Sequence, residues 1–93
     1  MRFFIKNKGG NNAEAWIEDG SKVVCEATLL TTLNSCLIDT IETKIEYRNK
    51  GYATKLIKEL QKRFTKVEPI GIEPEAKEFW DKLGMYDALG ETR

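Results

Sequence analysis

A short glycine turn joins two segments of different character at residues 48–53, Arg-Asn-Lys-Gly-Tyr-Ala. The residues before the turn are β-branched and favour an extended strand, whereas the residues after it have the spacing of an amphipathic helix. Backbone N–H groups at a helix start have no partner within the helix, and the helix dipole adds partial positive charge there. Gly51 lets the backbone approach a ligand closely. The turn therefore predicts a place for an anion such as phosphate.

The first half of the chain has the pattern of four consecutive strands. Asp19-Gly20 is a strong hairpin signal, and a second turn is predicted at Thr31–Ser35 around Asn34. The predicted strands are Arg2–Asn7, Glu14–Glu18, Lys22–Leu30 and Cys36–Ile45. Strands joined by such short connections predict an antiparallel meander.

The second half changes to helical spacing. A first helix is predicted from one apolar face that comprises Ala53, Leu56, Ile57, Leu60 and Phe64. A short fifth strand is predicted at Val67–Ile72, and the crossover through the helix places it parallel to the fourth strand. Pro74 suits the first turn of a second helix, which Gly84 would end with a left-handed cap. Met85–Leu89 is the candidate for a last short strand.

These elements predict one α+β domain over residues 1–93, with a mixed, mostly antiparallel sheet in the order β-β-β-β-α-β-α-(β). A chain of 93 residues can bury only a modest core. No apolar run is long enough for a membrane-spanning helix, and Met1–Lys6 has too short an apolar run for a signal peptide. The expected location is therefore the cytoplasm.

The chain contains two cysteines, Cys25 and Cys36, and no histidine. The cysteines do not form a C-x-x-C pair, and the lack of histidine argues against a zinc site and against a Cys-His nucleophile. We expect both to be reduced thiols in or near the core, with no metal site. We interpret Trp16 and Trp80 as core aromatic residues.

Charge is unevenly distributed although the net charge is zero. Residues 44–66 contain eight basic and two acidic side chains, whereas residues 67–93 contain three basic and seven acidic ones. The basic block surrounds the glycine turn and would attract an anionic, phosphorylated ligand. Nucleic acid is a weaker alternative, because aromatic residues are not interleaved with the basic ones.

Two segments resemble the Gcn5-related N-acetyltransferases. Residues 39–54, DTIETKIEYRNKGYAT, are similar to the family's fourth strand and pyrophosphate loop, and include its R-x-x-G-x-A spacing at Arg48–Ala53. Residues 76–85, AKEFWDKLGM, are similar to the family's A-x-x-F-Y-x-x-L-G-F helix and exit. Together with the segment between them, they cover about half of the chain.

This resemblance implies the acyl-CoA N-acyltransferase fold, with acetyl-CoA as cosubstrate. By position, amides of the loop would hold the pyrophosphate, and the fourth-strand backbone would pair with the pantetheine arm. The loop amides implied are those of Asn49, Lys50, Gly51, Tyr52, Ala53 and Thr54, and the strand residues are Ile41, Glu42 and Thr43. An ordinary turn is the alternative interpretation of Gly51.

The implied reaction is direct transfer of the acetyl group to an amine, which needs a proton acceptor and benefits from a proton donor. Glu68 and Asp39 stand at positions that the family uses for the base, although a solvated surface carboxylate is the favoured interpretation of each. Trp80 replaces the family's tyrosine acid, and an indole N–H cannot take over that role. Tyr86 and Tyr47 are the candidates to replace it.

The sequence departs from the family in two further respects. Glu73 stands where an asparagine often contacts CoA, so that contact is not expected. The interval 7–13 is too short for the helices that usually separate the first two strands. An open acceptor side suits a protein lysine or N-terminus, or closure by a second copy of the chain. Three hypotheses follow: an N-acetyltransferase, a non-catalytic acyl-CoA-binding module, and an interaction or nucleic-acid accessory domain that keeps only the fold.

Overall fold

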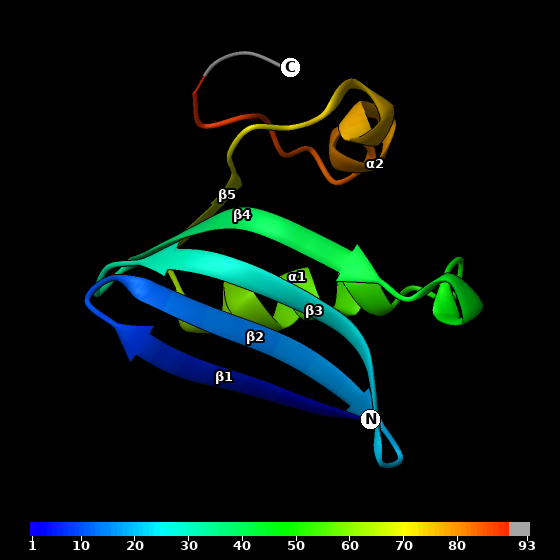
Figure 1. Ribbon diagram of the computed structural model, residues 1–93. Coiled ribbons are helices and arrows are strands. Elements are labelled where there is room, and N and C mark those ends of the chain that lie inside the picture. Colours follow the sequence, from blue (N-terminus) through cyan, green and yellow to red (C-terminus); the bar gives the residue numbers. More distant parts are fainter. Residues whose placement is uncertain (90–93) are drawn as a thin grey trace.

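Five strands form one mixed sheet in sequence order, β1-β2-β3-β4-β5 (Figure 1). The computed structural model describes residues 1–89, so the last four residues of the expected 1–93 domain lie outside the described part. The strands are β1 (Arg2–Gly9), β2 (Asn12–Asp19), β3 (Lys22–Thr31), β4 (Ser35–Thr43) and β5 (Lys66–Pro69). β1 to β4 pair antiparallel and β5 pairs parallel to β4. The predicted meander and crossover are confirmed.

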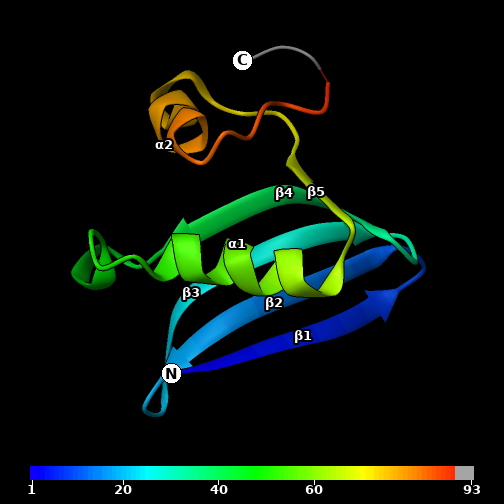
Figure 2. The ribbon, with the colours of Figure 1, turned by 180° about the vertical axis from the view of Figure 1, so that it is seen from behind.

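The helix α1 (Tyr52–Arg63) covers one face of this sheet (Figure 2). Its apolar side buries Leu56, Ile57 and Leu60, which join a core that includes Ala15 and Ile17 of β2. Every second residue of each strand points to this face. These side chains pack against the residues of α1 that are spaced three or four positions apart on its apolar side. The position of the first predicted helix is confirmed.

The opposite face of the sheet carries no helix within residues 1–89 (Figures 1 and 2). Trp16 lies half-buried on that face and stacks on Phe4, with ring centroids 5.4 Å apart. Its interpretation as a core residue is wrong, because strand alternation points it away from its buried neighbours Ala15 and Ile17. No helix of the described residues is long and apolar enough to cross a membrane.

β4 and β5 pair over four residues and then separate. Their ladder ends at Ile38 and Pro69, followed by one last hydrogen bond from the Ile70 N–H to the Ile38 carbonyl at 3.0 Å. Gly71 then has a left-handed φ of 66°, which turns the chain away from β4. The fifth strand is therefore shorter than the predicted Val67–Ile72.

The second helix begins as a 3₁₀ turn, Pro74–Ala76, and continues as α2 (Lys77–Lys82). Gly84 forms the left-handed cap beyond its last turn, as predicted, with a φ of 68°. The Gly84 N–H donates to the Asp81 carbonyl and the Met85 N–H to the Trp80 carbonyl, both at 3.0 Å. This hydrogen-bond pair is the Schellman motif that a C-terminal glycine allows.

The expectation of a last strand at Met85–Leu89 is wrong. These residues run beside β5 and make one backbone hydrogen bond to it, from the Ala88 N–H to the Pro69 carbonyl at 2.8 Å. The Asp87 side chain accepts hydrogen bonds from the N–H groups of Gly71 and Ile72, and Met85–Leu89 forms no ladder with β5. The chain is held at the sheet edge without extending the sheet.

Candidate functional site

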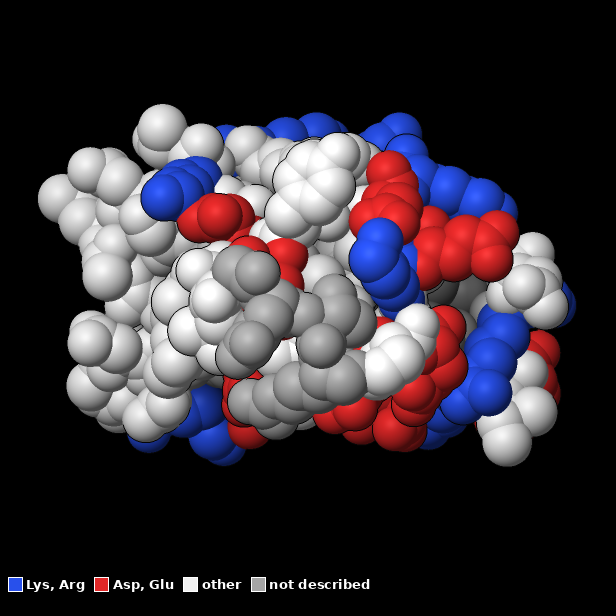
Figure 3. Space-filling view, turned by 90° about the horizontal axis from the view of Figure 1, so that it is seen from above, with Lys and Arg blue, Asp and Glu red and all other residues white. Residues whose placement is uncertain are grey.

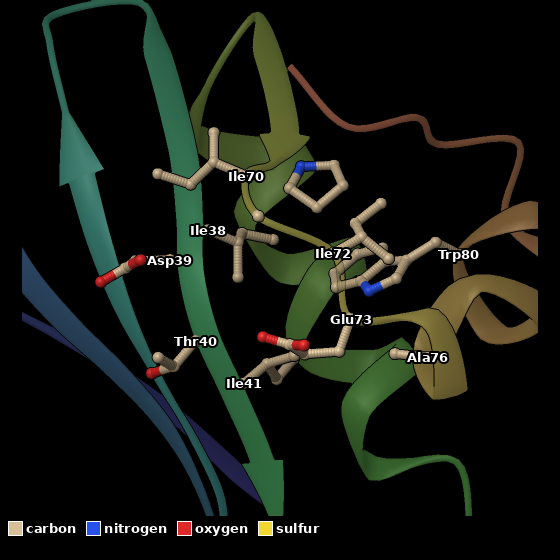
Figure 4. Close-up of a pocket in the computed structure, with 11 residues that line it drawn as sticks. Ile38, Asp39, Thr40, Ile41, Ile70, Ile72, Glu73, Ala76 and Trp80 are labelled. Carbon is tan, nitrogen blue, oxygen red and sulfur yellow. The ribbon is translucent and has the colours of Figure 1, made fainter. Parts of the chain in front are cut away.

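A cleft of about 310 Å³ opens where β4 and the β5–α2 connection separate (Figure 4). One wall is β4, and the other is formed by the connection and the start of the second helix. The lining residues are Ile38, Asp39, Thr40, Ile41, Pro69, Ile70, Gly71, Ile72, Glu73, Ala76 and Trp80. The floor is therefore apolar, whereas two carboxylate residues stand at the sides.

A β-bulge in β4 shapes the first wall. Thr28 of β3 pairs with Thr40 and the next residue, Leu29, pairs with Ile38, so Asp39 is the extra residue. A bulge bends its strand and interrupts pairing, which helps β4 to diverge from β5. Beyond Ile38 no strand pairs with the outer edge of β4 within the described residues. The edge from Asp39 to Thr43 includes all three residues predicted to bind pantetheine.

The turn before α1 lies at the far end of this edge (Figures 1 and 2). Asn49 and Gly51 have left-handed φ values of 63° and 82°. The N–H groups of residues 49–51 donate no hydrogen bond within residues 1–89, and those of residues 52–54 belong to the unpartnered first turn of α1. No acidic side chain lies in that turn, and no side chain caps it. The six predicted amides thus belong to one continuous turn.

Two side chains tie this turn to the sheet. The Arg48 Nε donates to the Thr43 carbonyl at 3.0 Å, and the Tyr52 hydroxyl donates to Asp19 Oδ2 at 2.6 Å. The hydrogen bond to Asp19 is the main reason that the pKa of Tyr52 lies above its ordinary value. A 3₁₀ turn at Ile45–Tyr47 begins two residues beyond β4, so the fourth strand is shorter than predicted, and Ile45 is exposed.

The two predicted base candidates have different surroundings. Asp39 lines the cleft, although its carboxylate points away from the opposite wall in Figure 4. Glu68 pairs with Lys66 at 3.1 Å and lines a second cavity of about 390 Å³ with Leu37 and Leu30. Strand alternation separates Glu68 from its neighbour Pro69, which faces the cleft. Both candidates stay predictions.

Trp80 lies at the inner end of the cleft and is buried. It packs edge-on against Phe79, with ring centroids 5.1 Å apart. Neither Tyr47 nor Tyr86 lines the cleft: Tyr47 packs against Tyr52, and Tyr86 is 71% exposed. Within residues 1–89, the residues that line the cleft therefore include no tyrosine.

Sequence reasoning missed the part played by Asp87. Its carboxylate accepts hydrogen bonds from the N–H groups of Gly71 at 3.2 Å and Ile72 at 2.8 Å. These amides belong to the wall opposite β4, so Asp87 fixes that wall after β5 ends. No local pattern indicates a contact across 15 or 16 residues between two irregular segments.

Cys25 and Cys36 are buried, as expected, and neither lines the cleft. Burial raises the pKa of Cys36 to about 11 and also raises that of Cys25. Both side chains are therefore neutral thiols at neutral pH, and neither is activated as a nucleophile.

Charges on the α2 side of the molecule are mixed rather than of one sign (Figure 3). On α2, Lys77 pairs with Asp81 at 2.7 Å and Lys82 with Glu78 at 3.3 Å. In the basic sequence block, Arg48 and Lys50 lie in the turn before α1, whereas Lys62 and Arg63 lie in the last turn of α1 and pair with Glu59.

No protein-family model matches the sequence, and no curated protein matches it. Solved structures, however, match the fold. A ribosomal-protein-alanine N-acetyltransferase from Brucella melitensis biovar Abortus 2308 superposes with a TM-score of 0.70 at 14% identity, over 89% of this chain and 69% of its own. An aminoglycoside N-acetyltransferase in complex with CoA gives 0.72 at 13% identity, over 99% and 95%.

A possible acetyltransferase from Clostridium difficile 630 gives a TM-score of 0.66 at 18% identity, over 84% of this chain. The chain spans 60% of that structure's length. These likenesses show that the chain has the fold of the Gcn5-related N-acetyltransferases, as its sequence motifs predicted. The fold by itself does not assign a reaction, because one fold can carry several functions.

Proposed function

We propose that this protein is an acetyl-CoA-dependent N-acetyltransferase that moves the acetyl group directly to an amine on a large acceptor, such as a protein. The observation that carries the proposal is the open outer edge of β4. From Asp39, which lines the cleft, to Thr43, on the side of the free amides before α1, this edge spans about 13 Å at about 3.3 Å per residue. An acyl-CoA could therefore bind with its phosphates at one end and its thioester at the other.

The groups along this path suit the parts of the coenzyme. The amides of Asn49 to Thr54 would donate to the pyrophosphate, with the partial positive charge of α1 behind them. The backbone of Ile41, Glu42 and Thr43 would pair with the amide groups of the pantetheine arm as an added strand does. The apolar floor of the cleft, with Ile72 and Trp80, would surround the acetyl end and exclude water.

The cleft would place the thioester beside the β4 bulge, where Asp39 is left out of the regular pairing with β3. Backbone N–H donors stabilise the negative charge that develops on the carbonyl oxygen when an amine attacks. The sheet face without helices leaves this region accessible to an acceptor larger than a metabolite. Asp39 and Glu68 stay the base candidates that the sequence suggested, of which only Asp39 lines the cleft.

Coenzyme binding can be tested by thermal unfolding of the protein with acetyl-CoA, CoA and ATP. A ligand at a hundred times its Kd stabilises the folded state by about 2.7 kcal/mol, which corresponds to a Tm increase of about 10 °C or more for a domain of this size. We expect this increase with both acyl-CoA and CoA and a smaller one with ATP. No increase at saturating coenzyme would leave only an interaction or accessory function.

A non-catalytic acyl-CoA-binding module is the second candidate, favoured by Trp80 in place of the tyrosine acid. Release of free CoA thiol from acetyl-CoA, measured with a panel of amines, peptides and proteins, separates the two functions. Acceptor-dependent release supports the transferase. Binding without release, over a panel that includes basic proteins and free N-termini, would favour the module.

A further inference from the structure

Glu73 is the carboxylate that reaches into the cleft. It lies on the β5–α2 connection, and Figure 4 shows its side chain extending toward Ile41 on the opposite wall. Within residues 1–89 it makes no ion pair and no side-chain hydrogen bond. It precedes the 3₁₀ turn at Pro74 but does not cap it. Its oxygens are therefore available to a ligand.

The backbone that carries Glu73 is fixed on both sides. Asp87 holds the N–H groups of the two preceding residues, and Ile72 is buried with 6% of its surface exposed. The Glu73 carbonyl accepts from the Ala76 N–H at 2.9 Å, and Pro74 restricts Glu73 to its extended conformation, with φ −73° and ψ 147°. A carboxylate on so constrained a segment can be positioned without a large entropic cost.

The other groups around the cleft do not offer the same arrangement. Among residues 1–89, Asp39 on β4 is the only other titratable residue that lines it, and its carboxylate points away from the Glu73 side. Trp80, from α2, contributes an indole that does not titrate. Glu68 belongs to the second cavity and is paired with Lys66.

We propose that Glu73 is the catalytic proton acceptor for the incoming amine; this inference rests on the proposed acetyltransferase function. The acceptor arrives as an ammonium ion, and Glu73 takes one of its protons. The freed nitrogen lone pair bonds to the thioester carbonyl carbon, and the carbonyl oxygen takes up negative charge. Collapse breaks the C–S bond, and the electron pair leaves on sulfur. The second nitrogen proton neutralises that thiolate, and Glu73 returns its own proton to water.

The central experiment compares Glu73→Gln with wild type in acetyl transfer to an alkylamine acceptor at neutral pH. Loss of a positioned base typically costs about 10²–10⁴-fold, and we expect a decrease in kcat/KM within that range. Glu75→Gln is the matched control, because it makes the same change two residues away on a side chain that is exposed like that of Glu73 but lies outside the cleft. Its kcat/KM should stay close to wild type.

A second acceptor separates a base from a residue that only shapes the cleft. Hydroxylamine is largely unprotonated at neutral pH, so its nitrogen needs no proton acceptor before attack. The deficit of Glu73→Gln should therefore shrink by at least about tenfold with hydroxylamine, whereas a deficit caused by distortion would persist for both acceptors.

Measuring the Kd for acetyl-CoA separates a failure of the role of Glu73 from a failure of the proposed function. If neither wild type nor variant binds acetyl-CoA, the functional proposal itself fails. If both bind it with similar Kd and Glu73→Gln transfers acetyl as fast as wild type, only the role of Glu73 is overturned. An equal loss with both acceptors would also overturn it, as would a loss that appears in Asp39→Asn and not in Glu73→Gln.

Discussion

The Tyr52 hydroxyl donates a 2.6 Å hydrogen bond to the Asp19 carboxylate. This contact joins the first residue of α1 to the β2–β3 hairpin, 33 positions away in the sequence. The rings of Tyr47 and Tyr52 also pack edge-to-face, with centroids 6.3 Å apart. The turn with the free amides is thus held by the sheet as well as by its own helix.

We predict that Asp19→Asn lowers the pKa of Tyr52 toward its ordinary value of 10.0. The contact with Asp19 favours the protonated phenol in the folded state, so its stabilisation is complete below pH 10 and is lost as pH rises through the raised pKa. Absorbance titration of tyrosinate ionisation can follow this change. Tyr52→Phe should remove the tyrosinate ionisation that occurs above the ordinary tyrosine pKa, whereas Tyr86→Phe should leave that ionisation in place.

We predict that Gly51→Glu abolishes coenzyme binding and leaves the fold intact. A Cβ added at this position has no atom within 4 Å, so the substitution causes no steric clash at Cβ. The φ of 82° costs any other residue about 1 kcal/mol, and the carboxylate places negative charge among the amides. Gly51→Ala is the matched control, with the same backbone cost and no charge. Calorimetric binding by Gly51→Glu equal to that of Gly51→Ala would contradict the loop assignment.

We predict that Asp87→Ala destabilises the cleft wall. Three backbone N–H groups, of Gly71, Ile72 and Leu89, would lose a charged acceptor, so the free energy of unfolding should fall by about 1–3 kcal/mol. Hydrogen exchange at the Gly71 and Ile72 amides should accelerate more than exchange in β2. Asp87→Asn keeps one acceptor oxygen and should give an intermediate result. Unchanged exchange at both amides in Asp87→Ala would show that the wall is held in another way.

We predict that Trp80→Tyr transfers acetyl faster than Trp80→Phe. Both changes remove similar volume from a buried site in the cleft, so their packing costs are comparable. Only tyrosine supplies a hydroxyl that can protonate a departing thiolate, and a positioned acid can contribute about 10²–10⁴-fold. The comparison uses kcat for the two variants at equal saturation. Equal kcat values would indicate that thiolate departure needs no acid here.

The elements of this fold could be predicted because each depends on local sequence patterns. Asp19-Gly20 gives the hairpin between β2 and β3, and the spacing of Leu56, Ile57 and Leu60 gives the buried face of α1. Gly84 gives the helix end, because it adopts a left-handed conformation at little cost. The resemblance to an acetyltransferase also came from contiguous motifs, and the comparison of folds agrees with it.

The ends of the elements and the cleft itself were decided by tertiary contacts. The strand pattern of Cys36–Ile45 continues past Thr43, where the chain leaves the sheet to reach α1. The pattern at Met85–Leu89 favours a strand, but the Asp87 side chain bonds the amides of Gly71 and Ile72 instead. A periodic pattern specifies which way side chains point, and it does not specify whether a partner strand is present.

The sequence by itself therefore determined the order of strands and helices, the crossover and the glycine turn with its unpaired amides. The tertiary structure decided which carboxylate enters the cleft. Asp39, Glu68 and Glu73 are all carboxylates in or beside predicted strands, and the sequence does not tell them apart. In the structure, Asp39 lies at the β4 bulge, strand alternation places Glu68 in the second cavity, and Glu73 lies on the segment that Asp87 fixes. The physical reason is that two side chains on separate elements approach each other only if the backbones that carry them lie close together. The spacing of residues within one element does not determine that distance.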